Sequence, residues 1–239
     1  MLANKTTPTI SWRSVLGFAF VITALLFQLD DAFAHNVTRE DAELIAGKTG
    51  WLFVLYTWLG AKHMVTGYDH LLFLVGVVFY LRNLRSVAIF VSLFAIGHSI
   101  TLISGVLLGL DVNPYLVDAI IGLSVAYKGF DNLSGFNTLF GDSPDEYMAV
   151  FIFGLFHGLG LATKLQDLGL AEDGLLANLV SFNFGVELGQ LAALAVILVA
   201  LRVMPADSQG SKIGAAVNWG LVLAGFTLMA YQLALYFNS

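Results

Sequence analysis

The chain contains no cysteine and few charged residues, and each shortage narrows what it can be. Without cysteine there are no disulfides and no thiolate metal ligands, so any metal site must use nitrogen and oxygen donors, which suit nickel, copper, zinc, iron or cobalt. Only 12% of the 239 residues are charged, whereas 58% are hydrophobic. A soluble domain has about 25% charged residues. The composition therefore predicts an integral membrane protein.

Several functional motifs are also absent. There is no basic stretch and the net charge is −6, which argues against a nucleic-acid partner. The sequence contains no P-loop, no HExxH zinc motif and no nucleophile elbow. Its length allows one compact bundle and leaves no room for a separate soluble domain. We therefore expect residues 35–239 to form a single transmembrane helical domain in the lipid bilayer.

The first 34 residues have the features of a cleavable secretory signal peptide. Lys5 and Arg13 give a positive start, residues 15–27 are apolar, and residues 32–34 form an A-x-A cleavage site. Cleavage would make His35 the new N-terminus, where its α-amine and imidazole could chelate a metal. Two alternatives stay open: an uncleaved first transmembrane helix, and a flexible leader in which His35 is incidental.

Six apolar segments of helix length follow, which predicts an all-α polytopic bundle of about six transmembrane helices. The first, residues 51–81, is too long for one straight span and is interrupted by polar residues around Gly67. We therefore expect a break near Gly67 and a helix over residues 68–81. The other spans are expected over residues 87–110, 115–132, 147–165, 175–203 and 213–237, with a loop over residues 133–146.

The positive charges favour one orientation of this bundle. If the mature N-terminus is outside the bacterial cytoplasmic (inner) membrane, alternation puts Arg82, Arg85, Lys128 and the loop over residues 202–212 inside. Positive residues are enriched in cytoplasmic loops, so this is the expected topology.

The histidines are the most informative residues of the chain. His98 and His157 lie in the middle of apolar runs, and His70 follows Asp69 at the start of an apolar run. At about 1.5 Å of rise per residue, His70, His98, His157 and Glu187 all fall near the middle of a hydrocarbon core about 30 Å thick. Ionisable groups at that depth are costly and are functional candidates. A single one could instead form a hydrogen bond between helices.

These four residues and His63 predict an intramembrane metal site. Imidazoles that share one ion need ligating nitrogens within about 3–4 Å of each other, because a metal–nitrogen bond is about 2 Å. An unbroken helix would separate His63 and His70 by about 10 Å. Only a break near Gly67 brings both close to one ion.

Other polar residues are candidates for supporting roles. Asp69 could cap the following helix, support the imidazole of His70, or do both. Asn183, Glu187 and Gln190 recur at helical spacing, so we expect them to share one face. Ser99 and Thr101 are further, weaker candidates, and the alternative for both is a hydrogen bond to their own helix and nothing more. Asp118 could form an acidic mouth with Asp111 and Asn113 or be an ordinary solvated charge.

Four stretches resemble the HupE/UreJ family of small bacterial membrane proteins. They are His63-x5-Asp69-His70-Leu-Leu-Phe, Gly97-His98-Ser99-Ile-Thr101, Phe156-His157-Gly158-Leu-Gly160 and Phe182-Asn183-Phe-Gly-Val-Glu187-Leu-Gly-Gln190, together with Ala34-His35. The resemblance implies a nickel or cobalt permease that serves hydrogenase or urease maturation, with His63, Asp69, His70 and His157 handling the metal. The best-described permeases have a glutamate shortly after Phe-His-Gly, which this chain lacks. The resemblance is therefore closer to a second, less characterised branch.

Three functions are compatible with these residues. The first is a divalent transition-metal permease, with nickel favoured and zinc, copper or cobalt possible. The second is an intramembrane zinc-type metallohydrolase, in which a metal held by histidines activates water and Ser99 assists. The third is a metal-delivery accessory subunit of a larger metalloenzyme, with His35 presenting the ion.

Overall fold

A computed structural model describes residues 39–81, 83–168, 170–203 and 212–239, and this part of the chain contains nine helices and no strand. The predicted signal peptide and His35 lie outside the described residues. The helices are α2 (Arg39–Ile45), α3 (Phe53–Thr66), α4 (Tyr68–Val78), α5 (Leu84–Leu108), α6 (Pro114–Asn132), α7 (Gly135–Phe140), α8 (Glu146–Asp167), α9 (Leu175–Val203) and α10 (Lys212–Asn238).

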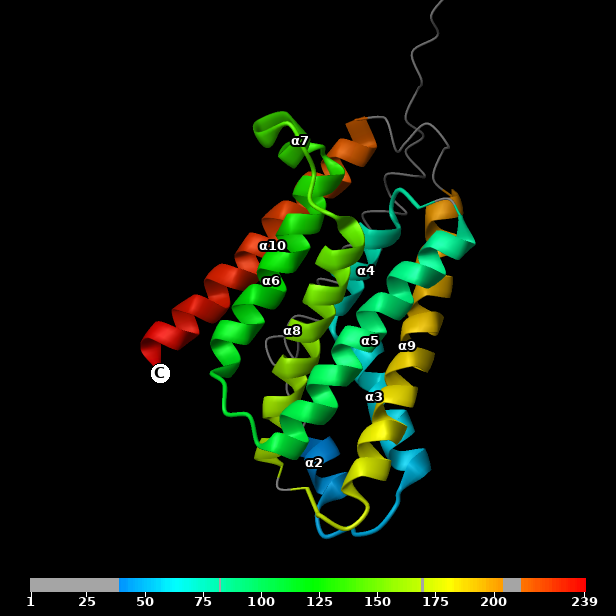
Figure 1. Cartoon of the computed structure of the whole chain (residues 1–239), viewed down its shortest axis with the longest axis vertical. Helices are drawn as coiled ribbons and strands as arrows, with labels where there is room; N and C mark the ends of the chain where they lie inside the picture. The colour runs from blue at the N-terminus through cyan, green and yellow to red at the C-terminus, as the bar shows by residue number, and fades with distance from the viewer. Residues whose placement is uncertain (1–38, 82, 169, 204–211) are drawn as a thin grey trace, which may run out of the picture.

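The long helices pack as three close pairs, α3 with α9, α5 with α8, and α6 with α10. Successive long helices run in opposite directions, so the short connections gather at the two ends of the bundle (Figure 1). Helix α4 lies inside this arrangement and contacts α3, α6, α9 and α10. The start of α4 is therefore surrounded by several helices, and this is where the candidate site forms.

Glycines let the paired backbones approach closely. A Cβ atom on Gly185 of α9 would overlap the carbonyl oxygen of Thr57 in α3, and one on Gly158 of α8 would overlap the carbonyl oxygen of His98 in α5. In the third pair, a Cβ on Gly225 of α10 would overlap the backbone nitrogen of Ala126. Small residues at helix interfaces are typical of membrane bundles, where dispersion contacts between helices replace the hydrophobic effect.

The predicted break in the first apolar segment is confirmed. Gly67 has φ −71° and ψ 99°, which is extended backbone, and separates α3 from α4. Its N–H still donates to the carbonyl oxygen of His63 at 2.9 Å, so the last turn of α3 is closed. A Cβ atom on Gly67 would lie only 2.8 Å from Nδ1 of His70. Glycine is needed here for space rather than for an unusual φ.

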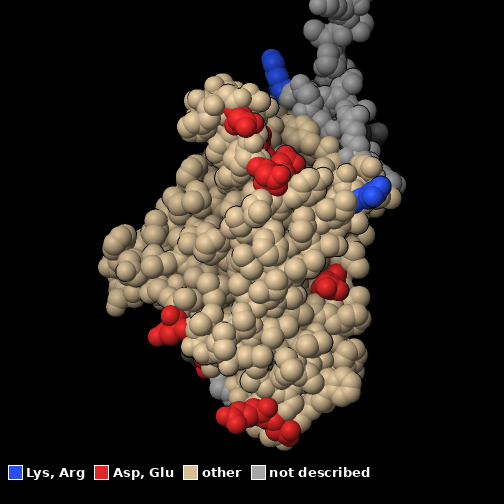
Figure 2. All heavy atoms as spheres, in the orientation of Figure 1, with Lys and Arg blue, Asp and Glu red and all other residues tan. Residues whose placement is uncertain are grey.

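The prediction of an all-α membrane bundle is also confirmed. Four of the described helices, α5, α8, α9 and α10, are long and apolar enough to cross a membrane. Helix α6 and the broken pair α3–α4 correspond to the two remaining predicted spans. Figure 2 shows charged side chains mainly towards the two ends of the molecule, with a wide, largely uncharged belt between them. That distribution suits a bilayer-embedded surface.

Two segments differ from the sequence predictions because short helices have weak sequence signals. The predicted loop over residues 133–146 contains α7, a six-residue helix. Residues 39–45, which follow the predicted leader, form α2. Lys62 Nζ lies 2.8 Å from Oδ1 of Asp41, so this ion pair ties α2 to α3.

Candidate metal centre

The centre of the site is the dipeptide Asp69-His70 in the first turn of α4. Oδ1 of Asp69 lies 3.0 Å from Nδ1 of His70, and both side chains are buried. The alternative role of Asp69 as a helix cap is not what the structure has, because the N-cap of α4 is Gly67 and no side chain caps it. The carboxylate instead orients the imidazole next to it, as carboxylates commonly do for metal-binding histidines.

Three further imidazoles surround His70, each from a different helix. The ring centroid of His70 lies 5.0 Å from that of His63 in α3 and 4.9 Å from that of His157 in α8. The ring of His98 in α5 is 6.3 Å away. The break at Gly67 makes the first of these contacts possible, because it folds the end of α3 back towards the start of α4.

These side chains form two groups, each able to hold a metal ion. His63, His70 and His98 make one group, and Asp69, His70 and His157 make the other. Within each group the candidate ligand atoms lie within 4.8 Å of one another. Ligands at about 2 Å from one ion are about 3–3.5 Å apart. A bound ion would therefore require small side-chain movements that bring these atoms closer together, and His70 belongs to both groups.

The hydrogen bonds of His157 show which nitrogen is available to an ion. Its Nδ1 lies 2.7 Å from the backbone carbonyl oxygen of Phe153. A carbonyl only accepts, so Nδ1 carries the hydrogen and Nε2 carries the lone pair. Nε2 of His157 and both ring nitrogens of His98 are buried without a hydrogen-bond partner in the described part of the chain. Buried polar atoms are normally satisfied, so this donor set fits a metal ion.

The predicted supporting residues hold the helices that carry these histidines. Ser99 of α5 donates to Oδ1 of Asn183 in α9 at 2.9 Å. Thr101 bonds weakly to its own helix, but its shortest bond crosses to the carbonyl oxygen of Leu155 in α8 at 2.6 Å. The idea that Ser99 and Thr101 only bond to their own helix is therefore wrong. Ser99 fixes α5 against α9 and Thr101 fixes it against α8, and both bonds lie close to His98.

Glu187 is placed differently from the prediction. Its side chain is exposed, whereas Asn183 and Gln190 of the same helix are buried, and it belongs to neither metal-binding group. Three residues of helix turn by about 300°, so Glu187 and Gln190 point about 60° apart. That angle is enough to place one inside and the other outside. The three residues were expected to share one face of α9, and Glu187 departs from this because it is exposed while the other two are buried.

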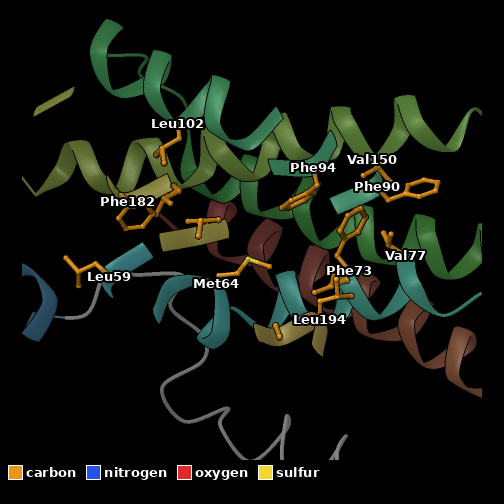
Figure 3. Close-up of a cluster of buried hydrophobic side chains, with 14 of the residues drawn as sticks. Leu59, Met64, Phe73, Val77, Phe90, Phe94, Leu102, Val150, Phe182 and Leu194 are labelled. Carbon is orange, nitrogen blue, oxygen red and sulfur yellow. The ribbon is translucent and has the colours of Figure 1, made fainter. Parts of the chain in front are cut away.

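Aromatic side chains enclose one side of the cluster. A cavity there is lined by His70, Gln190 and eight apolar residues, namely Met64, Phe73, Leu74, Val77, Phe90, Val91, Phe94 and Val150. The ring of Phe94 lies 4.9 Å from that of His157 and 5.4 Å from that of Phe73. Figure 3 shows Phe73, Phe90 and Phe94 close together with Val77 and Val150.

Asp118 is neither a solvated charge nor part of an open acidic mouth. Nζ of Lys164 in α8 lies 2.9 Å from its Oδ2, and the two side chains are only 9% and 10% exposed. The Asp118–Lys164 pair was not predicted from the sequence. The available signal was a lysine inside an apolar helix, which requires an acidic partner nearby.

The comparisons with known proteins agree with the motifs. The profile of the HupE / UreJ protein family matches residues 39–239, which is most of the chain. No curated protein and no solved structure matches it. Because the profile covers all the described helices, the chain belongs to the HupE/UreJ family.

Proposed function

We propose that this protein is a divalent transition-metal permease, and that nickel is its favoured substrate. The observation that carries the proposal is the convergence of four histidines and one aspartate, from four helices, into two overlapping groups inside a membrane bundle. A transport site must bind an ion strongly enough to select it and weakly enough to release it. Two incomplete ligand groups that share His70 meet this requirement better than one closed site would.

Family membership supports a role in metal transport, and the choice of nickel follows the resemblance described above. Ligand type alone does not select nickel, because imidazole also suits zinc, copper and cobalt. We propose that the protein lies in the bacterial inner membrane with the end of the bundle that bears Asp111 and Glu172 outside. Hydrogenase or urease maturation is the corresponding destination of the metal.

The metallohydrolase alternative gains nothing specific from the geometry. Ser99, its candidate assisting group, donates to Asn183 and so is engaged in holding α5 against α9. The delivery alternative depends on His35, which lies outside the described residues. The permease is therefore the function that the described site supports best.

The test is the metal content and the uptake activity of a His157→Ala variant. The full-length protein would be purified without added metal, analysed for bound metals, and reconstituted in proteoliposomes for nickel uptake. We expect His157→Ala to lose both bound metal and uptake while it remains folded in the membrane, because the lost group is a ligand.

Thr163→Val is the matched control on the same helix. Thr163 is buried and its hydroxyl donates only to the carbonyl oxygen of Gly160 at 2.8 Å, so its loss should leave metal content and uptake unchanged. Normal metal content in His157→Ala would show that this histidine is structural. Bound metal without any uptake by the unmodified protein would contradict the permease.

A further inference from the structure

A second cavity adjoins the histidine cluster on the side opposite the aromatic residues. It lies between α4, α6 and α10 and is lined by four polar residues, Tyr68, Asp69, Asp118 and Gln232, with Ile121, Gly122 and Leu228. Asp69 also belongs to the group formed with His70 and His157. One carboxylate therefore faces both the cavity and the candidate metal centre.

Asp118, which lines this cavity, is paired with Lys164 of α8. Nζ of Lys164 is 2.9 Å from Oδ2 and 3.2 Å from Oδ1 of Asp118, so the ammonium is shared between both oxygens. Buried ion pairs contribute little net stability, because desolvation offsets the attraction between the charges. Stability alone is therefore a poor reason for this pair. Chemically, the ammonium holds the place that another cation could take on the carboxylate.

Gln232 adds a neutral oxygen donor to the same wall. Its side chain is 8% exposed, and its carboxamide makes no hydrogen bond within the described part of the chain. A buried amide is normally satisfied by protein or by a bound species. Gly160 of α8 provides room beside Asp118, because a Cβ atom there would lie 3.3 Å from Oδ1 of the carboxylate.

We propose that this cavity is a cation vestibule, in which a divalent metal ion binds oxygen atoms of Asp118, Asp69 and Gln232 before it reaches the histidines. Lys164 holds Asp118 when no ion is present and moves off the carboxylate when one enters. The inference rests on the proposed function, since it describes how a transported ion would approach the cluster.

The difference in donors gives this path a direction. Oxygen ligands bind nickel or zinc ions less tightly than imidazoles do, and they also accept ions such as Mn²⁺. An ion in the vestibule would therefore be held weakly and with little selectivity. Transfer to the nitrogen donors of the cluster would be favourable and would provide the selection.

Helix α6 also carries a matched control for Lys164. Lys128 lies about 15 Å along α6 from Asp118. It pairs with Asp131 at 2.8 Å and with Glu146 of α8 at 3.3 Å. It is as buried as Lys164, but its partners Asp131 and Glu146 do not line the vestibule, whereas Asp118, the partner of Lys164, does. Like Lys164, Lys128 connects α6 and α8, but it lies near the opposite end of these two helices. Lys128→Met therefore removes a comparable buried lysine that is remote from the vestibule.

The experiment compares Asp118→Asn, Lys164→Met, the double variant and Lys128→Met in the full-length protein in lipid nanodiscs and proteoliposomes. We expect Lys164→Met to bind one additional, weakly held Mn²⁺ per chain, since Asp118 has lost its competing cation. In the unmodified protein and in Lys128→Met, Lys164 competes for Asp118, so Mn²⁺ should bind there much more weakly than in Lys164→Met. The double variant has lost the carboxylate and should not bind it. Asp118→Asn should keep nickel in the cluster but slow nickel uptake at low concentration by about tenfold or more, because it removes a ligand carboxylate from the vestibule and leaves the charge of Lys164 to repel the ion.

Two results would overturn the vestibule. They are no additional Mn²⁺ in Lys164→Met, and nickel uptake by Asp118→Asn within about twofold of the unmodified protein, well short of the expected effect of about tenfold. The single variants could misfold because one charge is left unpaired, whereas the double variant buries no uncompensated charge. In that case the nickel uptake of the double variant is the test, and uptake within about twofold of the unmodified protein would overturn the vestibule. Mn²⁺ titration measures binding and needs no transport. The vestibule proposal can therefore be refuted while the protein still transports nickel, and the permease proposal can be refuted while Lys164→Met still binds Mn²⁺.

Discussion

On one side of the histidine cluster the interior is lined by carboxylates, a phenol and a carboxamide, whereas on the other side it is lined by phenylalanine, valine and leucine side chains. The polar side lies near the start of α6 and the end of α8, and the apolar side lies near the start of α5 and the start of α8. Adjacent residues face the two cavities, Asp69 the polar one and His70 the apolar one.

In the proposed permease, this difference would let a small bundle bind an ion without forming an open pore. Carboxylates on the polar side lower the cost of bringing a cation into the bilayer, because they supply counter-charge and oxygen ligands. Aromatic rings on the apolar side offer neither, so an ion does not pass them while they remain packed. Hydrophobic constrictions act as gates in this way in other membrane pathways. In the proposed permease, an ion would then reach the site from the polar side only, for as long as the aromatic rings remain packed.

Removing the aromatic wall should have the largest effect on the protein. Phe94 is 3% exposed and contacts His157 and Phe73, so Phe94→Ala should create a cavity and cost about 3–5 kcal/mol of stability. Nickel should also leak from loaded proteoliposomes faster. Phe184→Ala is the control, because Phe184 is 46% exposed on the outer face of α9. Equal thermal stability and equal leak rates in the two variants would show that the aromatic side is no barrier.

The features that the sequence predicted depend on short-range geometry. Helical rise is constant, so the common depth of His70, His98 and His157 could be calculated before their helices were placed. The break at Gly67 followed from the excess length of the segment and its polar interruption. Both predictions need only the chain's own periodicity, and neither requires knowledge of which helices are neighbours.

The features that the sequence did not predict depend on how helices are rotated and paired. Glu187 differs from Gln190 by about 60° around α9, and only the packed bundle decides that the first is exposed. Asp118 and Lys164 are 46 positions apart, and their ion pair exists because α6 lies beside α8. The short helices α2 and α7 were missed because so few residues give little periodic signal.

Replacing the carboxylate that faces both sides should have an intermediate effect. Asp69→Asn keeps an oxygen that can accept from Nδ1 of His70 but removes the charge, so we expect nickel to bind about 10–100-fold more weakly. Isothermal titration of the purified protein would measure this. Asp41→Asn is the control, because Asp41 pairs with Lys62 between α2 and α3. An unchanged affinity in Asp69→Asn would show that the carboxylate does not support His70.

The smallest effect should come from Gln190, the polar side chain that lines the apolar cavity together with His70. Its Oε1 is buried without a hydrogen-bond partner in the described residues. An unsatisfied buried acceptor costs about 1–3 kcal/mol, so Gln190→Met, which keeps a similar volume, should raise the unfolding temperature slightly. The two candidate groups already contain three histidine or aspartate ligands each, so we expect nickel content to stay the same without the carboxamide. A fall in nickel content would instead mean that Oε1 contacts the ion. The aromatic side would then be part of the ion's path, and the contrast between the two cavities would no longer hold.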